Sequence, residues 1–206
     1  GGVLALALVL RYRPVHYAAQ MLPLPAALEY AVSAVTLLQR GVYALKVNHV
    51  AYPPEYPFGF PLLLAPFYAL FGPLAHNGAW ASLFYGLALQ AVAMLIARRL
   101  FGDGAALLAG IIIATSRQHV VSSQEIMSDA TSAMLALVAA YVLLRIAEGD
   151  RRYRHAFVAG LLAGLVVCVR LGDVAVAAAL GLAVVLAYGS PWRLALRALL
   201  TFTLGA

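Results

Sequence analysis

Long apolar runs alternate with short polar turns along most of the chain, and charged residues, Gly or Pro bound each run. Runs of this kind are typical of helices that lie in an apolar solvent. They predict spans at residues 1–10, 79–97, 105–115, 130–147, 156–169, 174–188 and 198–206. Several are shorter than the roughly 20 residues that cross a bilayer, as expected of helices that lean on neighbours or line a cavity.

Composition removes the soluble alternative. Of the 206 residues, 64% are hydrophobic and 11% are charged, whereas soluble domains are about 45–50% apolar and about 25% charged. The first and last apolar runs are cut short, so we expect a fragment of a longer chain. The predicted fold is all-α: a single multi-pass transmembrane bundle whose long first loop, residues 11–78, carries interfacial helices.

The basic residues orient this bundle. Eight of the fourteen Lys and Arg residues lie in three short connections, which the positive-inside rule places in the cytoplasm. They are Arg98, Arg99, Arg145, Arg151, Arg152, Arg154, Arg193 and Arg197. The net charge of +6 therefore reports topology rather than nucleic-acid binding. Loop 11–78 then lies outside.

One segment of that loop leaves an alternative open. Residues 58–74 are apolar enough to cross the membrane. Pro61, Pro66 and Pro73 argue against a regular crossing helix, which favours a segment lying in the interface. If the segment did cross, residues 11–57 would move to the cytoplasmic side.

Two polar stripes on the predicted outer side are candidate sites. Pro25 and Gly41 bound a predicted helix over 26–40, whose polar residues recur every three or four positions. These are Glu29, Ser33, Thr36 and Arg40, on an amphipathic helix suited to the membrane surface. The alternative is that Glu29 is only a surface carboxylate.

The second stripe leads into the span at 130–147. Glu125, Ser128, Asp129 and Ser132 share one helical face. Carboxylates beside a membrane helix are costly unless they face a cavity or a partner, so function is the first hypothesis. The alternative is that Ser128 or Asp129 caps the helix.

Metal and cofactor chemistry has little support. The histidines lack the spacing of metal ligands, and Cys168 is alone. A divalent metal is therefore unsupported, and no cofactor is expected. Two further outer turns hold Arg117, beside the second stripe, and Arg170, for which a simple pair with Asp173 is the alternative.

The order of these features resembles a known family. The segments YPPEYPFGFPLLLAPFYALFG and MSDA lie within residues 25–170. This region resembles GT-C glycosyltransferases of the dolichyl-phosphate-mannose protein mannosyltransferase superfamily, which includes bacterial lipid A aminoarabinose transferases. The resemblance implies transfer of a sugar from a polyprenyl-phosphate donor to a protein or glycolipid acceptor, with inversion, at the outer face of the bacterial inner membrane. Membrane lipid is a further expected partner.

The resemblance also implies roles for single residues. Asp129 matches the second acid of the family, whereas the first acid would fall near Ala26 or Ala27, so Glu29 is the nearest carboxylate. Either Glu29 takes the role of general base or this chain lacks one; Glu55 is a weaker substitute.

The remaining expected contacts involve the substrates. Arg117 or Arg170 would stabilise the leaving phosphate, and Tyr30 and Glu125 would bind substrate. The rival functions are a transporter or flippase and a non-catalytic protein that binds lipid-linked sugar. Acids gathered at one surface favour surface chemistry over transport, which needs polar groups deep in broken helices.

Overall fold

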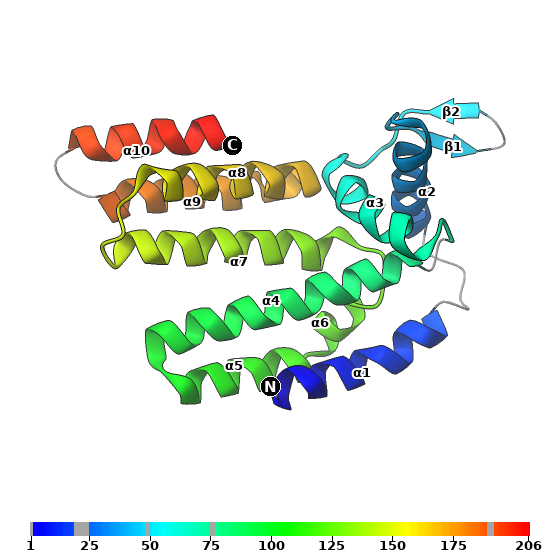
Figure 1. Cartoon of the computed structure of the whole chain (residues 1–206), viewed down its shortest axis with the longest axis horizontal. Helices are drawn as coiled ribbons and strands as arrows, with labels where there is room; N and C mark the ends of the chain where they lie inside the picture. The colour runs from blue at the N-terminus through cyan, green and yellow to red at the C-terminus, as the bar shows by residue number, and fades with distance from the viewer. Residues whose placement is uncertain (1, 19–24, 48–49, 75–76, 189–191) are drawn as a thin grey trace. The chain divides into compact units, whose positions relative to one another are not determined.

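The computed structural model describes residues 2–18, 25–47, 50–74, 77–188 and 192–206, and its elements are almost all helices (Figure 1). In chain order they are α1 (Gly2–Ala18), α2 (Pro25–Arg40), β1 (Leu45–Val47), β2 (Val50–Tyr52), α3 (Gly59–Phe71), α4 (Gly78–Phe101), α5 (Asp103–Thr115), α6 (Arg117–Ser122), α7 (Ser128–Ala147), α8 (Tyr153–Val169), η2 (Leu171–Asp173), α9 (Val174–Tyr188) and α10 (Trp192–Gly205). The all-α membrane fold is confirmed.

Three of these segments are long and apolar enough to cross a membrane among the residues described: Gly78–Phe101, Ser128–Ala147 and Leu171–Tyr188. The chain divides by its contacts into two units, Gly1–Thr131 and Ser132–Ala206, and each is described by itself. The single domain and its span limits stay predictions. Helix ends differ from the span limits where charges interrupt the apolar run: α4 continues through Arg98 and Arg99 to Phe101.

The helix predicted after Pro25 is confirmed as α2. It ends where expected, because Gly41 takes a left-handed φ of 67° and its N–H bonds to the carbonyl of Leu37 at 2.9 Å. The buried face of α2 carries small residues and Tyr30. A short antiparallel hairpin, β1–β2, follows it and pairs Leu45 with Tyr52.

The proline-rich segment 58–74 contains a helix, α3, while its prolines were expected to disfavour a regular helix that crosses the membrane. Pro61 lies in the first turn, where backbone N–H groups have no partner in the helix, and Pro73 follows the end at Gly72. Only Pro66 removes an internal hydrogen bond. The helix is 13 residues long, and its location in the interface stays a prediction.

In the first unit, polar side chains tie the helices together inside an apolar setting. Gln90 of α4 is buried, and its Nε2 donates to the carbonyl of Gly110 in α5 at 3.1 Å. Arg11 of α1 is also buried and donates to the carbonyls of Ala7 and Ile113, at 2.9 Å and 3.3 Å. The second of these is in the last turn of α5, where a cation offsets the negative end of the helix dipole.

The second unit packs α8 against both α9 and α10, around buried side chains that include Leu143, Val184 and Phe202. The approach of α8 and α10 is close because glycines face the neighbouring backbone: a Cβ at Gly160 would lie 1.9 Å from the carbonyl oxygen of Phe202. Small residues allow such contacts between membrane helices. The two helices lie side by side in Figure 1.

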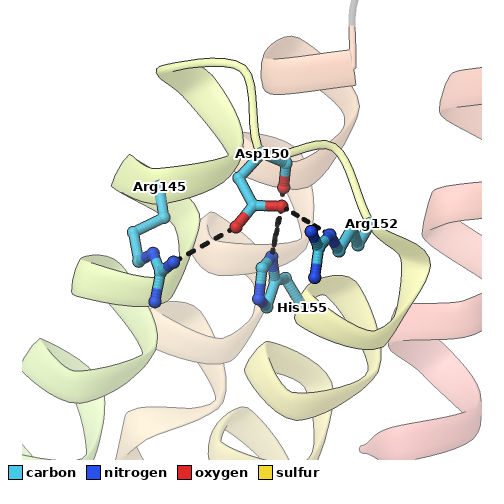
Figure 2. Close-up of polar contacts among 4 residues, drawn as sticks. All are labelled: Arg145, Asp150, Arg152 and His155. Atoms are coloured by element: carbon cyan, nitrogen blue, oxygen red, sulfur yellow. Dashed lines mark hydrogen bonds and ion pairs between the residues drawn. The ribbon is translucent and has the colours of Figure 1, made fainter.

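Charged groups close the turn between α7 and α8, as Figure 2 shows. The Asp150 carboxylate forms ion pairs with Arg145 and Arg152 at 3.2 Å each, and His155 Nδ1 lies 3.7 Å from it. His155 Nδ1 is also 3.1 Å from the Asp150 carbonyl oxygen, and Gly149 takes a φ of 115°. Asp150 thus holds the turn through its contacts with the basic side chains around it.

We expect Asp150→Asn to lower the free energy of unfolding by about 1 kcal/mol or less, because the arginines are exposed and surface ion pairs contribute little. The loss should shrink in high salt, which screens exposed charges. Denaturant unfolding of the detergent-solubilised protein at low and high salt measures both. A loss that salt leaves unchanged would show that packing, not charge, fixes the turn.

Candidate active site

Tyr30 is at the centre of the candidate site in the first unit. Its side chain is buried, and its hydroxyl donates to Ser128 Oγ at 3.4 Å, which joins α2 to the start of α7. Its ring contacts Tyr56 at a centroid distance of 4.8 Å and Phe60 at 4.9 Å. Packing of aromatic rings in offset or edge geometry fixes their orientation. Tyr30 therefore joins three segments that are distant in sequence.

Both predicted catalytic acids influence the pKa of Tyr30. Burial is the main cause that raises the pKa of Tyr30, and the negative charges of Asp129 and Glu29 raise it further, while the bond to Ser128 lowers it. The contacts agree with this, because Tyr30 bonds to Ser128, the neighbour of Asp129, and its ring contacts Tyr56, whose N–H bonds to Glu29. The structure thus brings Glu29 and Asp129 to one site.

Glu29 binds the backbone of residues 55 and 56, which lie just before the proline-rich segment. Its Oε1 accepts hydrogen bonds from the N–H groups of Glu55 at 2.6 Å and Tyr56 at 3.2 Å. The Glu29 side chain is half-buried, and no bond to its Oε2 is found among the described residues. One oxygen of the carboxylate therefore holds residues 55 and 56 in place.

Tyr43 completes this corner. Its hydroxyl donates a hydrogen bond to the carbonyl of Tyr56, and the N–H of the same residue donates to Glu29. Burial, followed by the charges of Glu29 and Tyr30, raises the pKa of Tyr43 to about 12. The Tyr43 hydroxyl is consequently a neutral donor at physiological pH.

We expect the absorbance change of tyrosine ionisation to show one group at about pH 12 that Tyr43→Phe removes. The folded pKa lies above the ordinary value of 10, so this hydroxyl favours folding below pH 10 and the contribution is lost as pH rises toward 12. Spectrophotometric titration of both proteins, subtracted, measures it. Tyr52→Phe, at an exposed tyrosine, is the control. A difference between the wild type and Tyr43→Phe that is centred near pH 10 would contradict the expectation.

The second stripe lies at the start of α7. Asp129 is in the first turn, where an acid also suits the helix dipole, and both Asp129 and Glu125 are half-buried. Ser128 is buried, and its Oγ accepts a hydrogen bond from the Tyr30 hydroxyl. This bond is a second role for Ser128 beside the helix cap that was the alternative for it.

The segment before the second stripe, with His119 and Ser123, packs against Gly86 of α4. A Cβ at Gly86 would lie 2.2 Å from Ser123 Oγ, and His119 Nε2 lies 3.2 Å from the Gly86 carbonyl oxygen. Burial and the charge of Arg11 lower the pKa of His119, against a smaller effect of the Gly86 carbonyl. The neutral imidazole holds this segment, and thereby the position of Glu125 and Asp129.

The predicted cations are found in different units. Arg117 is exposed on α6 of the first unit. Arg170 is exposed at the end of α8 in the second unit. The alternative partner of Arg170, Asp173, accepts a hydrogen bond from Ser132. Contacts of Arg117, Arg170, Glu125 and Tyr30 with substrate stay predictions.

Sequence reasoning missed the aromatic residues around the acids. Tyr43, Tyr56 and Phe60 contribute the hydroxyl, backbone and rings that surround Tyr30 and Glu29. The signal was the aromatic spacing in the segment YPFGF, which follows the two prolines. No group of three His, Cys, Asp or Glu side chains suited to a metal occurs in the part of the chain that the structure describes.

Comparison with known proteins identifies the family. The family model for dolichyl-phosphate-mannose-protein mannosyltransferases matches residues 55–206, well over half of the chain. That match includes Asp129 and the proline-rich segment 58–74, whereas α2 with Glu29 and Tyr30 precedes it. No curated protein matches, and no solved structure matches. The chain therefore belongs to the dolichyl-phosphate-mannose-protein mannosyltransferase family of GT-C type and is a membrane glycosyltransferase.

Proposed function

We propose that the protein transfers a sugar from a polyprenyl-phosphate carrier to a protein or glycolipid acceptor at the outer face of the bacterial inner membrane, with inversion at the anomeric carbon. The observation that carries the proposal is that Tyr30 links the segments of both acids: its hydroxyl bonds to Ser128, next to Asp129, and its ring contacts Tyr56, whose N–H bonds to Glu29. Two acids at one aromatic-lined corner suit a hydroxyl acceptor better than a transport path. A lipid-linked donor also accounts for the membrane setting.

The chemical step is a single displacement. The acceptor oxygen attacks the anomeric carbon, the bond from that carbon to the phosphate oxygen breaks, and polyprenyl phosphate leaves with the bonding electrons. Glu29 takes the acceptor proton through Oε2, because Oε1 is bonded to the backbone of Glu55 and Tyr56. General-base help of this kind contributes about 10²–10⁴ in rate.

The other residues position the reactants. Asp129 orients the acceptor hydroxyl. Tyr30 fixes the distance between the two acids through its bond to Ser128 and its ring contact with Tyr56. Arg117, in the same unit as the two acids, neutralises the charge that grows on the departing phosphate, and Glu125 contacts the sugar. No metal or cofactor is assigned beyond the lipid-linked donor.

A non-catalytic protein that binds lipid-linked sugar is the second candidate, and one observation favours it. Glu29 already has a structural role, since it holds residues 55 and 56 through their N–H groups. A transporter has less support, because the buried Gln90 of α4 is bonded to α5. Turnover therefore separates the two leading functions.

The test is transfer by the full-length protein in proteoliposomes from a polyprenyl-phosphate sugar. NMR of the product gives the anomeric configuration, which we expect to be opposite to that of the donor. Retention would contradict the single displacement. Donor binding without product would favour the non-catalytic function.

The side of the membrane is tested separately. Val42 is exposed just after α2, and a membrane-impermeant maleimide should label Val42→Cys in intact cells, with Cys168→Ser as background. Labelling only after the cells are opened would place α2 in the cytoplasm and contradict transfer at the outer face. A cysteine at Arg154, in a predicted cytoplasmic turn, is the control with the opposite expectation.

A further inference from the structure

A groove beside the second half of α2 lies apart from the residues around Tyr30. It has a volume of about 250 Å³ and is lined by Val32, Val35, Thr36, Gln39, Arg40 and Lys46, with Ala31 and Pro73 beside them. The acids of the candidate site do not line it. Lys46, on β1, is the single lysine in the chain; the other thirteen basic residues are arginines.

The lining combines cationic donors with an apolar floor. Arg40 and Lys46 carry the two positive charges, and neither has an acidic partner within the described residues. Thr36 donates its hydroxyl to the carbonyl of Val32, so the donors left for a ligand are Gln39, Arg40 and Lys46. Guanidinium and ammonium groups bind phosphate oxygens.

Exposed apolar residues continue from this groove along α2. Leu28 lies one turn before Val32, and Leu38 lies one turn after Val35, so each shares a side of the helix with a groove residue. Both leucines are more than two-fifths exposed, and so is Val42 just beyond the helix. A ligand whose phosphate met Arg40 and Lys46 would have apolar surface next to it.

We propose that this groove binds the phosphate headgroup of an anionic phospholipid of the surrounding bilayer, with its acyl chains against the exposed side of α2. An anionic headgroup matches the charges of Arg40 and Lys46, and the chains match the apolar side. A free anion would satisfy only the cations. The bound lipid anchors α2, and with it Glu29, which holds residues 55 and 56, at the membrane surface.

Acylation of Lys46 tests the proposal, because a bound phosphate shields its amine. The full-length protein is placed in nanodiscs of phosphatidylcholine, with or without phosphatidylglycerol, and the Lys46 peptide is quantified by mass spectrometry after brief amine labelling. We expect phosphatidylglycerol to slow labelling about threefold or more, as site occupancy protects by one plus the ratio of ligand to Kd. Lysine placed by Arg154→Lys, far along the chain, reports the general effect of a negative surface.

Two variants make the result specific to the groove. Arg40→Gln should abolish the protection, and so should Val35→Phe, which fills the groove but keeps both cations. Equal slowing at both lysines, or protection that survives in both variants, would overturn the proposal. Equal protection by inorganic phosphate in phosphatidylcholine discs would assign a free anion instead. Protection by polyprenyl phosphate but not by phosphatidylglycerol would assign the donor's carrier instead.

Discussion

Glu29→Gln is expected to lower the turnover of sugar transfer by about 10²–10⁴-fold while leaving donor binding nearly unchanged. The amide keeps an oxygen that accepts the N–H groups of Glu55 and Tyr56, so the backbone contacts survive. It cannot take a proton from the acceptor. The loss corresponds to about 3–5 kcal/mol of transition-state stabilisation and should be in kcat.

The matched control is Glu55→Gln. Glu55 lies in the same corner and carries the same charge, but its side chain is exposed and only its backbone N–H bonds to Glu29. We expect nearly normal transfer and the same unfolding temperature. If Glu55→Gln removed transfer and Glu29→Gln did not, the base would be Glu55.

Asp129→Asn is expected to reduce transfer at least tenfold, with a rise in the KM of the acceptor, because Asp129 orients the acceptor hydroxyl. Asp103→Asn, at an exposed acid that pairs with Arg98 at 2.7 Å, is the control for the loss of one charge. Steady-state transfer by full-length variants measures both. Normal transfer by both Glu29→Gln and Asp129→Asn would refute the acid assignments and favour the non-catalytic function.

The local elements of this site were predictable, and their long-range contacts were not. The proline start, the glycine end and the repeat of polar positions indicate α2 because each acts within a few residues. The bond from Glu55 to Glu29 joins residues 26 positions apart, and that from Tyr30 to Ser128 joins residues 98 apart. Hydrophobic periodicity carries no information on such pairs.

The same distinction explains α3. Prolines disfavour a helix through lost donors, but the loss depends on the turn in which each proline lies. Pro61 and Pro73 fall at the two ends of α3, where the cost is small, and only Pro66 is internal. The charges that mark the predicted spans similarly delimit apolar runs rather than helices. Helix α4 thus extends past Arg98 and Arg99.

The packing of α8 on α10 leads to the second large effect, on stability rather than chemistry. Three glycines make the contact: Gly160 and Gly164 of α8, and Gly205 of α10. A Cβ at each would lie 1.9 Å, 2.2 Å and 2.3 Å from the carbonyl oxygens of Phe202, Ala206 and Phe157. These atoms belong to the backbone, so no side-chain rotation relieves the clash.

Gly160→Ala is therefore expected to lower the free energy of unfolding by about 1–3 kcal/mol, and Gly160→Leu should prevent α10 from packing on α8. Gly104→Ala is the matched control, because it lies in helix α5 with no atom within 4 Å of its Cβ. That change should be neutral or stabilise by up to about 1 kcal/mol, since alanine loses less entropy in a helix than glycine. Reversible unfolding in detergent measures both variants. Equal stability of Gly160→Ala and Gly104→Ala would mean that α8 and α10 separate at little cost, and the close approach would then contribute nothing to holding the second unit together.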